Sequence, residues 1–386
     1  MNQADPKQVA RQRAERSHES LVGLSHWVHA NPELGFAEVQ ASGWLAQLLE
    51  QASFEVERGV GGLETAVAAR FGEGPLHVAL MAEYDALPGI GHACGHNIIC
   101  AASAGAAIAL AGVAGSLGLR VSVIGTPAEE GGAGKELLLR AGVFDGVHLT
   151  LMAHPGPSDL LEPNALAAQS LLVAYHGQTA HAAAFPERGI NASDAMVVAQ
   201  VAIGLLRQSV PASQRVHGIV THGGEAPNII PAETRGHFMI RASTLEELEA
   251  LKARVVRCFE AGALASGARL EIDEQIAYAE LHHDTELAAL YRNNAEALGR
   301  SFETEGRLQM TNFSTDAGNV SRVIPSIHPI IGIDSAPAVN HQPEFTAATV
   351  SPAADRAILD GAVALAWTAI DAAQDESIRD RLLASR

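Results

Sequence analysis

Four short apolar runs, with helix-forming segments between them, restrict this chain to a small group of folds. The runs are HVALMA (77–82), RVSVIG (120–125), LTLMAH (149–154) and HPIIGI (328–333). Helical segments at about 98–116 and 134–142 lie between the first three runs, and two more, at 7–30 and 38–52, precede them. Strands that alternate with helices predict an α/β fold, with a mostly parallel sheet covered by helices on both faces.

A block with a different pattern separates the third run from the fourth. QSLLVAYHG and GHFMIRAST alternate like half-exposed strands, whereas NASDAMVVAQVAIGLLRQS and TLEELEALKARVVRCFEAGA have helical periodicity. This order predicts a ferredoxin-like α+β domain inserted into the α/β domain. A chain of 386 residues is also longer than one core usually supports. We therefore expect one domain from 1–169 and 286–386, and an inserted domain from 170–285.

Charge and composition exclude several classes of partner. The formal charge of −18 argues against nucleic acid and anionic membranes, which both require basic patches. Residues 98–119 have the length of a membrane span but consist largely of Ala and Gly, so we expect a buried helix. The charged N-terminus resembles no signal peptide, and three cysteines form no disulfide framework. These features predict a cytoplasmic protein.

Groups that bind metals or carry protons gather where the predicted strands end. They are Asp85, Cys94 and His96 after the first run, Glu129 and Glu130 after the second, His154 closing the third, and His341 beyond the fourth. Sites in open α/β sheets form outside the carboxyl ends of the strands. Each residue alone has an ordinary structural explanation, but their coincidence at four strand ends predicts a site.

Thiolate, imidazole and carboxylate groups are the ligands of zinc and related ions. Five or six candidate ligands exceed what one tetrahedral ion takes, so we expect two divalent ions that share ligands. Two such ions can activate water and polarise a carbonyl at neutral pH. Of the adjacent Glu129 and Glu130, one could then be a ligand and the other a general base. Zinc or manganese suits these donors, and cobalt or nickel is also compatible.

Motifs along the chain resemble the metal-dependent aminoacylase and carboxypeptidase superfamily. They are MAEYDALPGIGHACGHN, GTPAEEGGAGK, AHPG, GQTAHAAAFPERGINASDA, EAPNIIPAETRGHFMIRA and NHQPEF, in the order of that family. The resemblance implies metal ligands at Cys94, His96, Glu130, His154 and His341, with the Cys94 sulfur bridging two ions. It also implies that Glu129 is the general base and that Asp85 orients one of the ligands without binding the metal itself.

For the inserted domain the resemblance implies a lid that also forms a homodimer. His181 would reach the active site of the partner subunit and polarise the scissile carbonyl. Asn228 and Arg241 would bind the carbonyl and carboxylate of the substrate. Much of the amidohydrolase branch has Asp where this chain has Asn97 and Glu83. The chain is thus closer to aminobenzoyl-glutamate hydrolases and to dipeptidases that act on dipeptides with a basic C-terminal residue.

These features predict hydrolysis of the amide bond in an N-acyl or aminoacyl amino acid. A carbamoyl-amide hydrolase of the allantoate type shares the architecture and is the second enzymatic interpretation. A metal-binding or peptide-binding protein without catalysis is the third. Release of ammonia from ureido substrates, or of amino acids from dipeptides, separates the two enzymatic interpretations.

Overall fold

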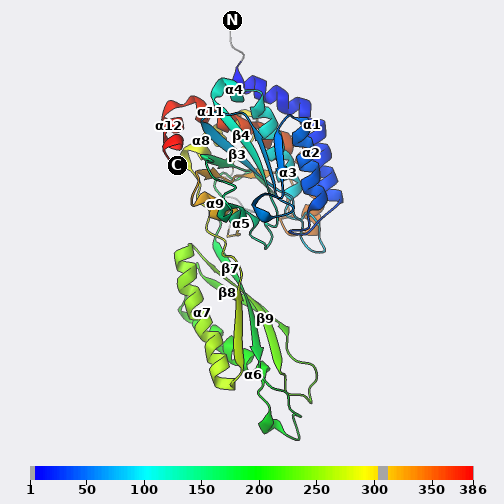
Figure 1. The fold of residues 1–386 in the computed structure, drawn as a ribbon, viewed down its shortest axis with the longest axis vertical. Coiled ribbons are helices and arrows are strands. Elements are labelled where there is room, and N and C mark those ends of the chain that lie inside the picture. The colour runs from blue at the N-terminus through cyan, green and yellow to red at the C-terminus, as the bar shows by residue number, and fades with distance from the viewer. Residues whose placement is uncertain (1–4, 303–311, 386) are drawn as a thin grey trace. The chain divides into compact units, whose positions relative to one another are not determined.

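The computed structural model describes residues 5–302 and 312–385, which fold into two compact units (Figure 1). The first, here called the α/β unit, consists of Met1–Asn164 and Leu281–Arg386. The second, the inserted unit, consists of Ala165–Glu280. Within the described ranges, no helix combines the length and apolar character that a membrane crossing requires.

A six-stranded sheet organises the α/β unit, in the order β1-β2-β4-β3-β5-β11. Its strands are β1 (Glu55–Arg58), β2 (Val67–Phe71), β3 (Leu76–Glu83), β4 (Leu119–Thr126), β5 (Leu149–Leu151) and β11 (Ser326–Ile327). The pairs β4–β3, β3–β5 and β5–β11 are parallel, whereas β1 and β2 join antiparallel at one edge. The predicted α/β class with a mostly parallel sheet is confirmed.

Helices cover this sheet on both faces. The helices of the unit are α1 (Pro6–Ala30), α2 (Val39–Gln51), α3 (His96–Ala111), α4 (Ala114–Leu117), α5 (Gly134–Arg140), α8 (Thr285–Ala297), α9 (Ala317–Ser321), α10 (Pro343–Ala348), α11 (Pro352–Gln374) and α12 (Glu376–Ala384), with a 3-10 turn at Val60–Gly62. All eight residues of β3 are buried, as expected for a parallel strand at the centre of a sheet. Its consecutive residues Leu80 and Met81 belong to separate cores, because successive side chains of a strand point to opposite faces of the sheet.

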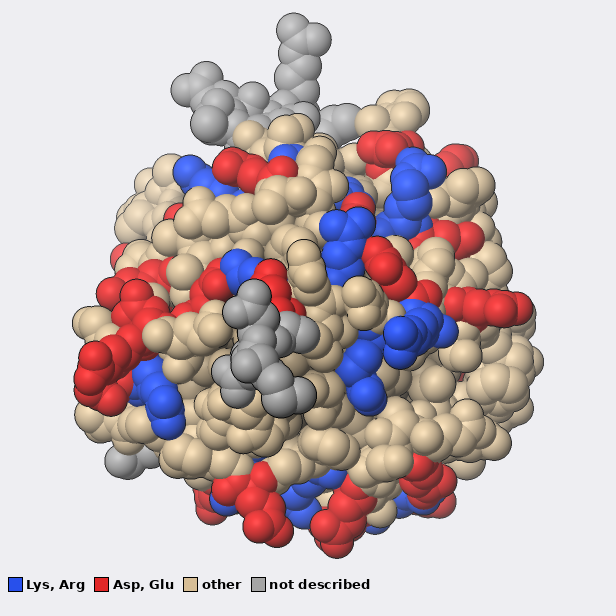
Figure 2. Space-filling model, turned by 90° about the horizontal axis from the view of Figure 1, so that it is seen from above, with Lys and Arg blue, Asp and Glu red and all other residues tan. Residues whose placement is uncertain are grey.

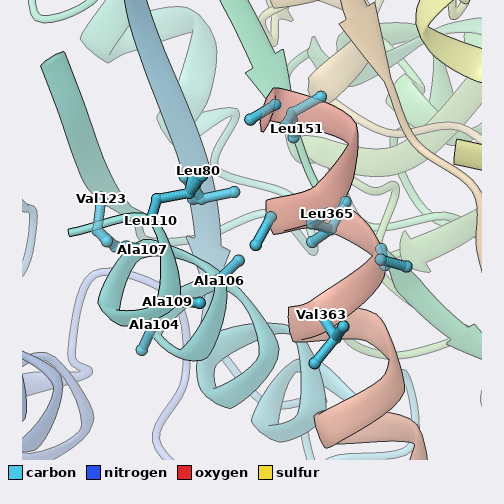
Figure 3. Close-up of a cluster of buried hydrophobic side chains, with 14 of the residues drawn as sticks. Leu80, Ala104, Ala106, Ala107, Ala109, Leu110, Val123, Leu151, Val363 and Leu365 are labelled. Atoms are coloured by element: carbon cyan, nitrogen blue, oxygen red, sulfur yellow. The ribbon is translucent and has the colours of Figure 1, made fainter. Parts of the chain in front are cut away.

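Most of the segment 98–119 is a buried helix, as its composition predicts. It belongs to α3 as far as Ala111, and the remainder includes the short helix α4 and the first residue of β4. Every residue of α3 is buried, and its alanines lie between Leu80 and Val123 of the sheet and Val363 and Leu365 of α11 (Figure 3). Small side chains permit this close packing. A Cβ atom at Gly105 would lie 2.7 Å from Leu21 of α1, so that helix could not approach as closely.

Two of the predicted strands are interrupted. The run 149–154 is divided into β5 and β6 (His154–Gly156), and the run 328–333 begins after β11 and contains β12 (Ile330–Gly332). The chain leaves the large sheet at both points, and β6 and β12 pair with each other as a separate parallel ribbon. His154 therefore begins a strand rather than ending one.

The inserted unit is a four-stranded antiparallel sheet with two helices. Its elements are β7 (Ala167–His176), α6 (Ala192–Leu206), β8 (Arg215–His222), β9 (Glu233–Ala242), α7 (Leu245–Ser266) and β10 (Arg269–Glu274), with 3-10 turns at Pro186–Arg188 and Arg207–Ser209. The strand order is β10-β7-β9-β8. Residues alternate between buried and exposed along β9, because α6 and α7 pack on one face only.

Charged side chains of both signs are interspersed over the described residues of the face drawn in Figure 2. Acidic residues nevertheless exceed basic ones by 44 to 26 in the whole sequence. Binding to a polyanion such as nucleic acid requires clustered positive charge, and the interspersed charges on the described part of this face do not provide such a cluster.

Candidate metal centre

The loops at the carboxyl ends of β3 and β4 supply most of the polar groups of one site in the α/β unit. The first loop leads from β3 through Cys94 into α3, which begins at His96. Gly95 separates these two residues with a left-handed φ of 83°, and a Cβ atom there would lie 2.4 Å from Pro155. Glycine thus lets the loop carrying Cys94 and His96 approach the strand that carries His154.

Three donor atoms form a first group at this site. The donor atoms of Cys94, His96 and His154 all lie within 4.8 Å of one another, and all three residues are buried. The Cys94 Sγ atom is 3.4 Å from His154 Nε2. Nitrogen and sulfur ligands of one tetrahedral zinc ion are about 3.5 Å apart. This spacing fits a shared ion.

A second group shares the same sulfur atom. Donor atoms of Cys94, Glu130 and His341 also lie within 4.8 Å of one another, and Glu130 Oε1 is 3.3 Å from His341 Nε2. His341 adopts a left-handed φ of 68°, which is uncommon for a residue with a side chain. Its amide donates to the Ala93 carbonyl at 2.8 Å, which fixes the loop against the Cys94 segment.

Hydrogen bonds orient the imidazoles of the first group. His154 Nδ1 lies 2.8 Å from the Pro155 carbonyl, and His96 Nδ1 lies 3.0 Å from Asp85 Oδ1. A ring nitrogen that donates to an oxygen leaves the other nitrogen free to bind a metal, so both histidines present Nε2 to the site. Asp85 Oδ2 also accepts from the Glu130 amide at 3.0 Å. One buried carboxylate thus links the two loops.

Glu129 lies beside both groups and is almost fully buried. Its Oε2 atom is 3.8 Å from His96 Nε2, and it forms a third cluster with His96 and Glu130. Burial, followed by repulsion from Glu83 and Glu130, raises the pKa of Glu129 well above its ordinary value. Glu130 differs, because the hydrogen bond to His341 and the charge of His96 outweigh burial and lower its pKa. The two neighbouring carboxyls are therefore suited to different tasks.

These donors fit a divalent metal cluster. Thiol, imidazole and carboxylate groups meet at ligand spacing, and the Nε2 atom of His96 is buried without a hydrogen-bond partner among the described residues. Burial, with help from the charge of Glu130, raises the pKa of the Cys94 thiol, so a thiolate here requires a nearby cation. Cys94 belongs to both donor groups, which is the arrangement expected of a bridging ligand.

Three further charged residues lie at the site, although the sequence did not predict them as site residues. Glu83, Lys135 and Asp316 are fully buried, and Glu83 and Asp316 form a cluster with Glu129. In the sequence, Glu83 is notable only because much of the related amidohydrolase branch has Asp at this position. Lys135 is notable only as the final residue of the motif GTPAEEGGAGK. Asp316 follows a segment without strand or helix periodicity, so no sequence pattern connects it to the others.

The structure places the other three predicted site residues in the inserted unit. His181 and Asn228 lie on adjacent turns, because the Ala182 amide donates to the Asn228 carbonyl at 3.0 Å. The His181 side chain is exposed, and its Nδ1 accepts from two backbone amides, of Ala183 and Ala184. Arg241, on β9, is half-buried and opposite Arg215 of β8.

Comparisons with known proteins show which family the chain belongs to. The model of peptidase family M20/M25/M40 matches residues 79–358. A Xaa-Arg dipeptidase from Mus musculus is 39% identical across 95% of this chain and 88% of its own length. A p-aminobenzoyl-glutamate hydrolase chain from Escherichia coli (strain K12) is 33% identical, covering 67% of this chain and 58% of that relative.

Solved structures show the same fold. A dinuclear metal-binding peptidase from Bacillus subtilis aligns with a TM-score of 0.71 at 22% identity, covering 94% of this chain and 99% of that one. An aminobenzoyl-glutamate utilization protein from Klebsiella pneumoniae aligns with a TM-score of 0.70 at 20% identity, covering 90% of this chain and 97% of that one. From the family match and the identity to these relatives, the chain belongs to peptidase family M20/M25/M40 and is a hydrolase.

Proposed function

We propose that this protein hydrolyses the amide bond of dipeptides and related N-acyl or aminoacyl amino acids, with dipeptides ending in a basic residue as the preferred class. The observation that carries the proposal is a buried carboxylate, Glu129, beside two donor groups that share the Cys94 sulfur. The relatives named as a Xaa-Arg dipeptidase and an aminobenzoyl-glutamate hydrolase support the substrate class.

Five residues would hold two divalent ions, with Cys94 common to both. His96 and His154 would complete one site, and Glu130 and His341 the other. When bound, the ions would polarise the substrate carbonyl and lower the pKa of water to roughly 7. Zinc or manganese suits this mixture of donors, and cobalt or nickel is compatible with it.

Glu129 would act as the general base and then as the acid. Its carboxylate lies in the same cluster as His96 and Glu130, so it is next to the place where water would be activated. Burial is the largest cause that raises the pKa of Glu129, and a raised pKa makes the carboxylate a better proton acceptor. It would take a proton from water and pass it to the departing amine.

The inserted unit would supply substrate contacts, with His181 serving the partner subunit. Because His181 Nδ1 accepts backbone hydrogen bonds, its neutral ring carries the proton on Nε2, which is then a donor for a carbonyl oxygen. Arg241 would bind the substrate carboxylate, and the neighbouring Arg215 adds positive charge. Asn228 would contact the substrate carbonyl.

The test is a screen of purified protein supplemented with zinc, manganese, cobalt or nickel. Substrates are dipeptides with varied C-terminal residues, N-acyl amino acids, aminobenzoyl-glutamate and ureido compounds, and the products are free amino acids and ammonia. We expect the highest kcat/KM for dipeptides that end in arginine or lysine. Ammonia release from ureido compounds alone would instead support the allantoate-type alternative, and inertness toward all of them would support a binding protein.

A homodimer through the inserted unit is also proposed, from an exposed apolar surface. Val197, Val201 and Leu205 recur every four residues on α6 and are 55%, 59% and 64% exposed. At the sheet edge, β8 leaves one side without a partner strand in the described chain, and its Ile219 is 64% exposed. Free strand edges and apolar helix stripes are self-association surfaces, and a two-fold axis would bury both.

Charge placed on the α6 stripe should separate the subunits. We expect the double variant Val201→Glu/Leu205→Glu to sediment as a monomer of 40.3 kDa and to lose turnover while keeping its metals. The turnover loss follows if His181 acts in the partner's site. Leu264→Glu is the matched control, because Leu264 is 88% exposed on α7 and should leave the dimer intact. A monomeric wild-type protein, or a double variant that stays dimeric, would contradict the interface.

We also propose that the reaction takes place in the cytoplasm. Cys94, Cys100 and Cys258 form no disulfide bonds, as is usual in reducing compartments.

A further inference from the structure

Beside the proposed metal ligands lies a buried charge triad, defined here as Glu83, Lys135 and Asp316. Lys135 Nζ is 2.6 Å from Glu83 Oε1 and 2.6 Å from Asp316 Oδ1, and all three side chains are fully buried. Asp316 Oδ2 also accepts from the Lys135 amide at 2.8 Å. Three segments meet here, namely the end of β3, the first turn of α5 and the start of α9.

Fold stability alone does not explain this triad. Taking a carboxylate or ammonium out of water costs several kcal/mol, and packed apolar residues often replace buried ion pairs without loss of stability. Glu83 and Asp316 carry two negative charges against one positive charge on Lys135. The triad therefore retains a net negative charge inside the protein, and such a charge requires a further positive partner.

The position for this positive partner is on the side of the triad that faces the metal centre. Glu83 Oε2 is 3.3 Å from His96 Nε2, the nitrogen that faces Cys94 and His154. The opposite nitrogen of the ring, Nδ1, is held by Asp85 at 3.0 Å. The His96 imidazole thus lies between two buried carboxylates. Asp85 orients the ring at Nδ1, and Glu83 lies beside Nε2 without a hydrogen bond to it. A cation bound at Nε2 would lie close to the excess negative charge of the triad.

The triad itself is not a third metal site. Donor atoms of Glu83, Glu129 and Asp316 lie within 4.8 Å of one another, as ligands would. However, the Lys135 ammonium already contacts Glu83 and Asp316, and a cation between them would have to displace it. Burial alone would lower the pKa of Lys135, but attraction to Asp316 and then to Glu83 outweighs burial and raises this pKa above its ordinary value. Lys135 therefore stays charged as an ammonium group.

We propose that Glu83 is a positioning residue of the metal centre, held in place by Lys135 and Asp316. Beside Nε2 of His96 it supplies the negative charge that strengthens binding of the ion there. This inference rests on the proposed function, because it requires a metal at His96. Partners of metal ligands commonly contribute 10-fold to 100-fold to metal affinity.

The test is a titration of metal-free protein with cobalt(II), followed by its visible absorption spectrum. In Glu83→Gln, Lys135 keeps Asp316 as its partner, so the variant removes the negative charge at His96 without leaving the ammonium unpaired. We expect the cobalt Kd to rise about 10-fold to 100-fold, with a shifted spectrum, because the negative charge beside the ion at His96 is removed. Asp371→Asn is the matched control, because Asp371 pairs with Lys7 through a similar 2.7 Å contact outside the site.

The outcomes separate this inference from the proposed function. A wild-type protein that binds no cobalt or zinc would overturn the function itself. Wild-type binding, together with an unchanged Kd and spectrum in Glu83→Gln, would overturn the positioning role alone. If Glu83→Gln does not fold, the same titration is made on Asp316→Asn, where Lys135 retains Glu83. There we expect weaker cobalt binding, because the excess negative charge is gone, and unchanged binding would contradict the proposal.

Discussion

Replacing Glu129 by Gln should lower kcat by about 100-fold to 10,000-fold while both metal sites stay filled. The amide keeps the size of the side chain but cannot accept a proton from water, so only the general-base step is removed. This loss corresponds to about 3 to 5 kcal/mol of transition-state stabilisation. The measurement combines steady-state kinetics on a basic dipeptide with metal analysis of the same sample.

The control for this variant is Glu73→Gln, which neutralises an exposed carboxylate in the loop before β3. It should match the wild-type protein in kcat and in metal content. Retention of more than about a tenth of the wild-type rate by Glu129→Gln would refute the role of Glu129, because general bases contribute at least about 100-fold. Loss of metal would instead identify Glu129 as a ligand and leave the base unassigned.

The gathering of the candidate ligands follows from sheet geometry, and this part of the site was accessible from the sequence. Parallel strands end at the same edge of a sheet, so the loops carrying Cys94 and Glu130 had to be neighbours once β3 and β4 were recognised. His154 illustrates where hydrophobic periodicity stops being informative. Its apolar run looks continuous, but the chain changes sheets within it, and hydrophobicity does not record which strand will be the partner.

Contacts between distant loops could not be predicted in this way. Lys135 and Asp316 are separated by 181 positions, and their ion pair depends on how α5 packs against α9. Neither residue lies at the end of a recognised strand, and a lysine in the first turn of a predicted helix resembles a solvated surface group. The predicted sheet also lacks the edge strand β1 and its neighbour β2, because their short runs EVER and VAARF mix charged and apolar residues.

Replacing Cys94 by Ala should have the second large effect, the loss of both ions. Its sulfur belongs to both donor groups, so its removal leaves His96 and His154 in one group and Glu130 and His341 in the other. Each remaining pair is a weak site, since catalytic zinc usually needs three protein ligands. We expect fewer than one ion per chain after dialysis and no measurable turnover.

Two matched variants make this expectation specific to a bridging sulfur. Cys100→Ala removes another buried thiol, six positions along in α3, and should keep both ions and the wild-type rate. His341→Ala removes a donor that belongs to one group only, so it should release one ion and retain the other. If Cys94→Ala also released a single ion, the sulfur would serve one site. The two ions would then have to share another group, and Glu130, which clusters with both His96 and His341, is the remaining bridge that the geometry offers.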